Sequence, residues 1–178
     1  MKVDSYSIQL ADADGTRRMG ASLGKVLVAD RIDQPFIIHL KGELGAGKTT
    51  FASGMLNGMG YVGAVRSPTY TLIEPYELSC TGVTTATINV MHMDLYRLTD
   101  PSQLNELGVR DMLIARTVLM IEWPERAGEY LPQSDIVINL AYPAVGVSGR
   151  ALNVVANSAL AWQLLQQAYS HTLTPHES

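Results

Sequence analysis

The sequence predicts an α/β fold built as a three-layer sandwich, with a mixed, mainly parallel central sheet and an added antiparallel hairpin. Two short apolar runs, residues 36–40 and 117–121, have the continuous hydrophobicity of strands that are buried on both faces. A helical pattern follows the first run almost at once, and a glycine turn separates two alternating segments late in the chain. Strands that alternate with helices are typical of parallel sheets, and the late turn adds the antiparallel pair.

The elements of the first half follow from hydrophobic periodicity and from the breaks between the periodic segments. Apolar side chains recur at helical spacing in two segments, and Gly60 is a natural terminator for the second. We expect, in order, a strand at 5–10, a helix at 14–28, a strand at 36–40 and a helix at 48–59.

The second half combines alternating segments with turn residues. Pro101 is suited to open a helix, and the Thr-rich stretch with a glycine at 79–87 suggests a turn or loop. We expect a strand at 67–73, a strand at 88–94, a helix from about 100 to 109, a strand at 117–121, a hairpin of 134–142 with 151–156, and a helix at 159–169.

The length and composition indicate one folded domain over residues 1–178, with a frayed tail at about 172–178. A formal net charge of −4 and an isoelectric point of about 5.5 argue against a protein that grips nucleic acid unaided, because neutralising phosphates requires clustered Lys and Arg. The single cysteine, Cys80, has no internal disulfide partner, and no apolar run suits a signal peptide or a membrane span. We therefore expect a cytoplasmic protein.

One motif carries most of the chemical information. Residues 42–49 match the G-x-x-x-x-G-K-S/T pattern of a P-loop, and the strand and helix that the pattern requires are both readable, so we reject a ligand-free glycine turn. In such a loop the backbone N–H groups surround phosphate oxygens, Lys48 reaches the β- and γ-phosphates, and the Thr49 hydroxyl ligates Mg²⁺. We expect a P-loop NTPase-like protein whose nucleotide contacts include Gly42, Glu43, Leu44, Gly45, Ala46, Gly47, Lys48, Thr49 and Thr50.

Two carboxylates follow predicted strands, Asp94 and Glu122. The carboxyl ends of strands form the ligand-binding edge of open α/β sheets, where a P-loop protein needs an acid to hold magnesium directly or through water. We expect Glu122 to share the metal with Thr49, and Lys48, Asp94 and Glu122 to be the catalytic residues. The alternatives are a solvent-facing Glu122 at a strand exit, and an Asp94 that caps a helix or pairs with Arg97.

Three further features lie beside this predicted edge. Trp123 either packs by the nucleotide or plugs the strand end, and His92 is expected to be a structural histidine rather than a catalytic base. The Ser-Pro-Thr-Tyr-Thr segment at 67–71 is either a nucleotide-sensing switch or a Thr-rich edge strand. The sequence has no Asn-Lys-x-Asp element, so ATP is favoured over GTP.

Taken together, the segments GELGAGKTTF, SPTYTLIEPYE, HMDLYRL and IEWPER resemble the TsaE family, small ATPases of bacterial threonylcarbamoyladenosine synthesis on tRNA. The resemblance runs the length of the chain. It implies an ATPase that acts on the complex of TsaB and TsaD, the latter being the enzyme that modifies adenosine 37 of tRNAs reading ANN codons. The tRNA would then be reached only through that complex.

The resemblance also implies roles for individual residues. The loop glycines would bind phosphate with Lys48, Thr49 and Glu122 would associate with Mg²⁺, Asp94 would be needed for hydrolysis, and Trp123 would lie close to the nucleotide. Two departures are that Glu43 stands where the family often has Asp, and that residues 78–87 look longer than a minimal turn, which would alter a partner-facing surface.

Two other functions fit the same motif. A small-molecule kinase shares the loop and the size, but it usually supplies a lid with several arginines, which are dispersed here. A nucleotide-dependent adaptor would bind ATP without hydrolysing it. Because no complete catalytic set is evident, we expect the chain alone to turn ATP over slowly and a partner to supply a group in trans.

Overall fold

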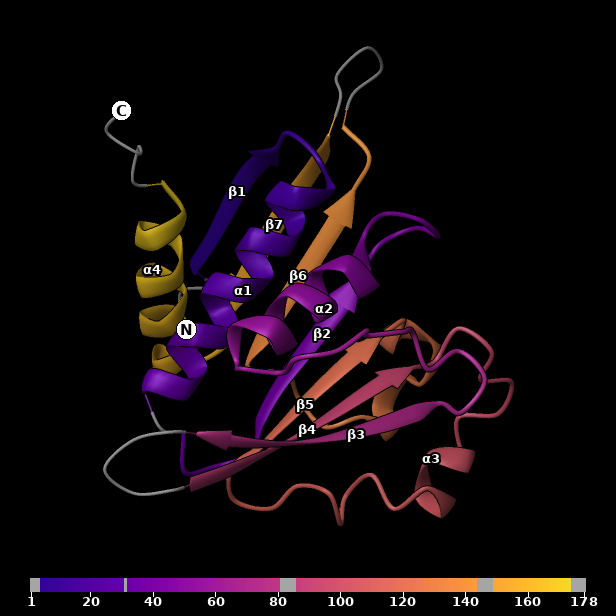
Figure 1. Ribbon diagram of the computed structural model, residues 1–178. Coiled ribbons are helices and arrows are strands. Elements are labelled where there is room, and N and C mark those ends of the chain that lie inside the picture. Colours follow the sequence, from indigo (N-terminus) through magenta and orange to yellow (C-terminus); the bar gives the residue numbers. More distant parts are fainter. Residues whose placement is uncertain (1–3, 31, 81–85, 144–148, 174–178) are drawn as a thin grey trace.

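A computed structural model describes residues 4–30, 32–80, 86–143 and 149–173, and a seven-stranded mixed sheet forms its centre (Figure 1). The strand order is β1-β7-β6-β2-β5-β4-β3. In the middle, β2 (Phe36–Lys41) pairs in parallel with β5 (Thr117–Glu122) and with β6 (Ile136–Ala141), and β5 pairs in parallel with β4 (Ala86–Asp94). The predicted α/β class and its parallel centre are confirmed.

The outer strands pair in the antiparallel direction. At one edge β7 (Arg150–Ala156) lies between β6 and β1 (Asp4–Leu10), and at the other edge β3 (Ile73–Cys80) pairs with β4. The β6–β7 pair is the predicted late hairpin, although the glycine turn at 144–148 lies outside the described residues. Antiparallel pairs at both edges thus flank four parallel strands.

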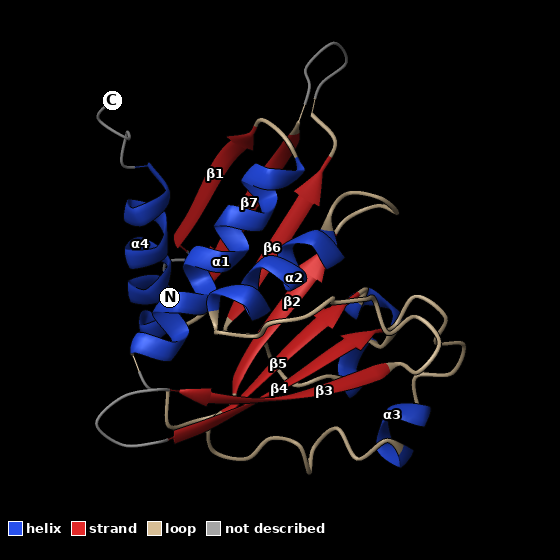
Figure 2. Cartoon of the chain, viewed as in Figure 1, coloured by secondary structure: helices blue, strands red, loops and turns tan. Residues whose placement is uncertain are grey.

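Layers of different thickness cover the two faces of the sheet (Figure 2). On one face lie the three longer helices, α1 (Ala13–Ala29), α2 (Lys48–Gly58) and α4 (Ala159–Leu173). The other face carries α3 (Gln103–Glu106), the short 3₁₀ turns η1 (Pro124–Arg126) and η2 (Gly128–Tyr130), and the chain around them. None of the helices within the described ranges is long and apolar enough to cross a membrane.

Strand alternation decides which side chains reach the helical face. In β5, Val118 and Met120 belong to the core beneath the three long helices, whereas Leu119 and Ile121 belong to the opposite core. Because side chains alternate along a strand, Glu122 follows Met120 onto the α2 face. In β4 the same alternation puts His92 and Asp94 on the face of Val90, which is also the α2 face.

Two predicted element boundaries are wrong near the third strand. Residues 67–72 form a loop and not a strand, because the Ser67 and Thr69 hydroxyls hydrogen bond to Asp94 and the ladder begins only at Ile73. The predicted loop at 79–87 is partly strand, because the β3–β4 ladder pairs Ser79 with Thr87 and Cys80 with Ala86. Residues 81–85 lie outside the described part of the chain.

Two predicted helices also differ in length. The helix expected after Pro101 is a single turn, and Leu104 is its only buried residue, so little apolar surface is available to extend it. The last helix is longer than predicted and runs from Ala159 to Leu173, which includes the start of the expected tail, whereas residues 174–178 are outside the described ranges.

Candidate functional site

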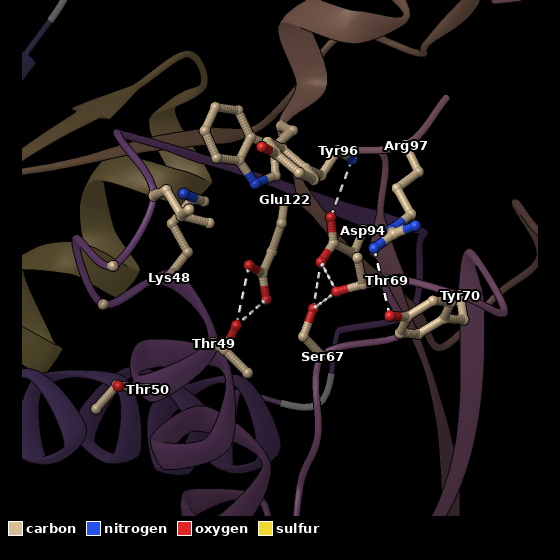
Figure 3. Close-up of a pocket in the computed structure, with 14 residues that line it drawn as sticks. Lys48, Thr49, Thr50, Ser67, Thr69, Tyr70, Asp94, Tyr96, Arg97 and Glu122 are labelled. Atoms are coloured by element: carbon tan, nitrogen blue, oxygen red, sulfur yellow. Dashed lines mark hydrogen bonds between the residues drawn. The ribbon is translucent and has the colours of Figure 1, made fainter. Parts of the chain in front are cut away.

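A cleft opens where β2, β4 and β5 end, at the edge of the sheet that the sequence singles out (Figure 3). Its volume is about 490 Å³. One wall is the glycine loop, residues 42–49, together with the first turn of α2. The opposite wall is the loop 67–70, and Asp94, Glu122 and Trp123 contribute the strand ends.

Close packing against the neighbouring strand fixes the start of the glycine loop. Gly42 has a φ of 136°, and a Cβ at this position would collide with the carbonyl oxygen of Leu140 in β6, so only glycine fits. Further along, the Ala46 N–H donates to the Glu43 carbonyl oxygen at 3.1 Å and closes a turn. Since α2 begins at Lys48, the amide groups at its N-terminus and their partial positive charge lie beside the cleft.

Lys48 is the cation inside this wall. Its Nζ donates to the carbonyl oxygens of Gly42 at 2.6 Å and Glu43 at 2.9 Å, and it lies 3.8 Å from the ring centroid of Trp123. An ammonium group has three N–H donors, so one is left for a ligand. Burial lowers the pKa of Lys48, and nearby carboxylates oppose that shift; they are Glu122, Glu125, Asp94 and Glu43.

Glu122 is buried and is held from two directions. The Thr49 hydroxyl donates to its carboxylate, with Oγ1 at 2.9 Å from Oε1 and 3.1 Å from Oε2, while His92 Nε2 lies 2.9 Å from Oε1. Only 2% of Glu122 and none of His92 is exposed, so the alternative of a solvent-facing glutamate is wrong. The partner of His92 Nε2 is thus the predicted metal ligand, whereas the buried Nδ1 has no hydrogen-bond partner among the described residues.

Asp94 organises the opposite wall. Its Oδ2 accepts hydrogen bonds from the Ser67 hydroxyl and, at 2.8 Å, from the Thr69 hydroxyl, while Oδ1 accepts from the Tyr96 backbone N–H at 3.0 Å. The alternative of an ion pair with Arg97 is wrong. That guanidinium instead lies 4.3 Å from the ring centroid of Tyr70.

The aromatic residues at the mouth of the cleft contact one another. Trp123 and Tyr96 have ring centroids 5.0 Å apart, and both line the cleft. Tyr70 is 82% exposed, and Arg97 packs against it, with Arg97 Nη2 donating to the Tyr70 hydroxyl at 3.3 Å. Trp123 therefore lies where a bound ligand would meet it, and it also packs at the end of β5.

The predicted contact residues divide into two groups. Those that line the cleft are Leu44, Gly45, Gly47, Lys48, Thr49, Thr50, Asp94, Glu122 and Trp123. Gly42, Glu43 and Ala46 instead belong to the frame of the loop. The sequence did not predict that Ser67 and Thr69 would bind Asp94. It also gave no signal for Tyr142 and Arg150, which reach the loop from outside the cleft.

The oxygen donors at the base of the cleft suit a hard cation. The Thr49 hydroxyl and the Glu122 carboxylate are adjacent, and Mg²⁺ is usually bound through one or two protein oxygens, with phosphates and water completing its octahedron. Within the described ranges no group of three or more His, Cys, Asp or Glu side chains could form an all-protein metal cage. The donor set therefore fits a magnesium ion that arrives with a phosphate ligand.

Comparison with known proteins gives a consistent result. Residues 10–149 match the family model described as threonylcarbamoyl adenosine biosynthesis protein TsaE. The chain is 37% identical to the TsaE protein of Haemophilus influenzae over 79% of this chain and 84% of that protein, and 35% identical to that of a Nostoc species over 80% and 82%. The crystal structure of Bacillus subtilis YdiB superposes with a TM-score of 0.73 and 25% identity over 96% of this chain and 98% of that one.

Proposed function

Because the chain belongs to the TsaE family of threonylcarbamoyl adenosine biosynthesis proteins, we propose that it binds and hydrolyses ATP as an accessory factor in this tRNA modification. Family membership supplies the pathway. The convergence of Lys48, Thr49 and Glu122 in one cleft is the observation that supports the nucleotide chemistry.

The phosphate chain of ATP would lie against the glycine loop. The α2 N-terminus, the loop amides and the remaining donor of Lys48 together offer a concave positive surface to phosphate oxygens. The charged side chains that line the cleft balance, with Asp94 and Glu122 against Lys48 and Arg97. Because this lining supplies no net positive charge to neutralise a triphosphate, the nucleotide would be expected to bind with its counterion and not as the bare anion.

Magnesium would be that counterion, with the Thr49 hydroxyl as a direct ligand and Glu122 as a direct or water-mediated one. Bound there, Mg²⁺ would neutralise the charge that develops between the β- and γ-phosphates. To become a ligand, Thr49 must turn its oxygen lone pairs to the metal while the buried His92 keeps Glu122 in place. Loss of a residue that orients a metal ligand typically weakens metal binding by about 10–100-fold.

Asp94 would act on the γ-phosphate side of the cleft. Its carboxylate is buried but faces the cleft from β4, and it already organises the Ser67 and Thr69 hydroxyls. A carboxylate in this position can orient the attacking water or accept its proton, and the two hydroxyls can report whether a γ-phosphate is present. Trp123 and Tyr96 would lie beside the rest of the nucleotide.

The partner would be the TsaB–TsaD complex, and tRNA would be reached through it. The net charge of −4 supports an indirect contact, because a chain of this charge lacks the excess of cations that grips a phosphate backbone. Arg97 lines the cleft, but its guanidinium lies against the Tyr70 ring and hydrogen bonds to the Tyr70 hydroxyl. We therefore expect slow turnover until a partner contributes a group.

Reconstitution of tRNA modification tests the proposal. Purified TsaB, TsaD, tRNA and threonylcarbamoyl donor would be assayed for repeated cycles with the wild-type chain, with Asp94→Asn, or with neither. We expect multiple turnovers and ATP consumption with the wild-type chain only. Normal cycling by an Asp94→Asn chain that binds but does not hydrolyse ATP would favour the adaptor, and a phosphorylated metabolite would favour the kinase.

A further inference from the structure

The outer side of the glycine loop is held by two side chains from the β6–β7 hairpin. The Tyr142 hydroxyl donates to the Leu44 carbonyl oxygen at 3.0 Å. Arg150 donates from Nε to the Ala46 carbonyl oxygen at 3.1 Å and from Nη2 to the Gly45 carbonyl oxygen at 3.3 Å. Three successive loop carbonyls are therefore bound by two side chains, which we call the carbonyl clamp, and neither side chain lines the cleft.

The clamp is a single unit on a rigid support. The Arg150 guanidinium lies 4.6 Å from the ring centroid of Tyr142, so each side chain limits the motion of the other. Tyr142 directly follows β6, which pairs with the strand that leads into the loop. Arg150 opens β7 and is paired with Leu10 of β1, so its backbone is fixed within the sheet.

Fixing these carbonyls also fixes the amides that a phosphate would use. The peptide group is planar and its C=O and N–H point in opposite directions, so an outward Leu44 carbonyl turns the Gly45 N–H inward. The Ala46 carbonyl turns the Gly47 N–H in the same way. Both glycines line the cleft, whereas the Ala46 N–H between them is already used by Glu43.

Tyr142 also lies close to the backbone of Gly45. Gly45 has a φ of 77°, which strains any other residue, and a Cβ there would lie 2.7 Å from the Tyr142 hydroxyl oxygen, so the tyrosine would have to shift away. The glycine and the tyrosine are thus fitted to one another, although nearly a hundred residues separate them in the sequence.

We propose that Tyr142 and Arg150 are positioning residues that set the affinity of the glycine loop for the phosphates of a nucleotide without touching the nucleotide. This proposal rests on the proposed function, because it requires phosphate binding at the loop. The clamp acts equally on a diphosphate and a triphosphate, since the amides that it orients form the loop itself. It changes binding and leaves the hydrolysis rate at saturation unchanged.

Conservative variants separate geometry from charge. Arg150→Lys keeps the positive charge but cannot span two carbonyls with fixed fork geometry, and Tyr142→Phe keeps the ring but removes the hydroxyl donor. Arg116→Lys is the matched control for the arginine, because Arg116 is half-exposed and precedes β5 at the opposite end of the sheet. Tyr130→Phe is the control for the tyrosine, since Tyr130 is 43% exposed and lies in η2.

Calorimetric titration with Mg·ADP and Mg·ATP measures the effect. We expect Arg150→Lys to weaken both nucleotides by about tenfold and Tyr142→Phe by about threefold, since a charge-assisted hydrogen bond contributes more than a neutral one. Both controls should bind like the wild type. Hydrogen exchange of the ligand-free variants should be faster at residues 44–47, whereas turnover at saturating Mg·ATP should not change.

Three results would overturn the proposal. The first is wild-type nucleotide affinity in both clamp variants, and the second is unchanged hydrogen exchange at residues 44–47. The third is wild-type affinity in Arg150→Lys with a loss only in Arg150→Gln, which would mean that the charge of Arg150 matters and its geometry does not. Failure of the wild-type chain to bind either nucleotide would contradict the proposed function instead, and the exchange of the ligand-free loop would still test the clamp.

Discussion

The two walls of the cleft are built in different ways. The glycine loop is fixed by its neighbours along its whole length, from Gly42 against β6 to the three carbonyls that Tyr142 and Arg150 bind. The 67–70 wall has fewer restraints: the Ser67 and Thr69 hydroxyls both bind Asp94, and Tyr70 at its outer end contacts Arg97. One wall is therefore preformed, and the other depends mainly on Asp94.

This difference suggests separate roles for the two walls of the cleft. A binding surface gains affinity when its donors are ordered before the ligand arrives, because less conformational entropy is lost on binding. A responsive segment needs few restraints, so that a new contact can shift it. We interpret the glycine loop as the segment that binds the phosphates and the 67–70 loop as the segment that moves when they are bound.

Removing the cation of the preformed wall should have the largest effect. In Lys48→Ala we expect ATP turnover to fall by about 10³-fold, because the developing phosphate charge loses its buried ammonium donor. Steady-state phosphate release with the reconstituted complex measures this. Lys25→Ala on the exposed side of α1 is the control, and equal activity of both variants would remove Lys48 from the site.

Removing the carboxylate that holds the 67–70 wall should have the next largest effect. We expect Asp94→Asn to lower turnover by about 10²-fold and to change Mg·ATP affinity by no more than about threefold, since the role proposed for Asp94 is to act on the attacking water and not to bind phosphate. Hydrogen exchange at residues 67–71 should become faster while exchange in the glycine loop stays slow. Equal acceleration in both segments would mean that the walls are not independent.

The buried histidine offers a finer test at the junction of the two walls. His92→Leu should raise the Mg²⁺ concentration at half-maximal turnover by about tenfold, because Glu122 loses the donor that orients it. The amide of Gln places a donor near the original Nε2, so His92→Gln should restore most of the magnesium response. A magnesium dependence that is the same in the wild type and the Leu variant would limit His92 to packing.

The smallest effect concerns the strand beneath the preformed wall. Burial, with a smaller contribution from Lys41, lowers the pKa of His39 in β2 from 6.5 to about 4, and its Nε2 has no hydrogen-bond partner among the described residues. The unfolded chain therefore protonates His39 at a higher pH than the folded chain does. The free energy of unfolding keeps its full value above pH 6.5, where His39 is neutral in both states, and decreases as the pH falls toward 4. We expect a loss of about 1–2 kcal/mol at pH 5, since residual solvent contact screens the effect.

His39→Gln isolates this contribution. The variant cannot titrate between pH 4 and 6.5, so its unfolding free energy should fall less than that of the wild type when the pH is lowered from 7 to 5. Denaturant unfolding at the two pH values measures the difference. Parallel pH curves for the two proteins would show that His39 does not titrate differently in the folded state.

The sequence was sufficient for the parts of the molecule that depend on local patterns. Periodicity identified β2 and α2, the motif identified the loop between them, and the ends of two predicted strands identified Asp94 and Glu122. Prediction from the sequence failed where hydrogen bonds to a side chain took the place of a strand's backbone ladder. Residues 67–72 have β-type composition, but the hydroxyls there bind Asp94 and the strand begins later.

Other features were unreadable because they join distant segments. Tyr142 bonds to a carbonyl 98 residues away and Arg150 to carbonyls 104 and 105 residues away, and neither is part of a recognisable motif. The His92 contact with Glu122 depends on the register of β4 against β5, which a single sequence does not fix. Alternation alone did place His92 and Asp94 on one face.

Calorimetric titration of the wild-type chain with Mg·ATP, alone and with TsaB–TsaD present, tests the central claim most directly. One nucleotide should bind per chain, and the heat should disappear in Lys48→Ala and weaken when magnesium is removed. The absence of any binding heat under both conditions would contradict a preformed phosphate grip in the glycine loop.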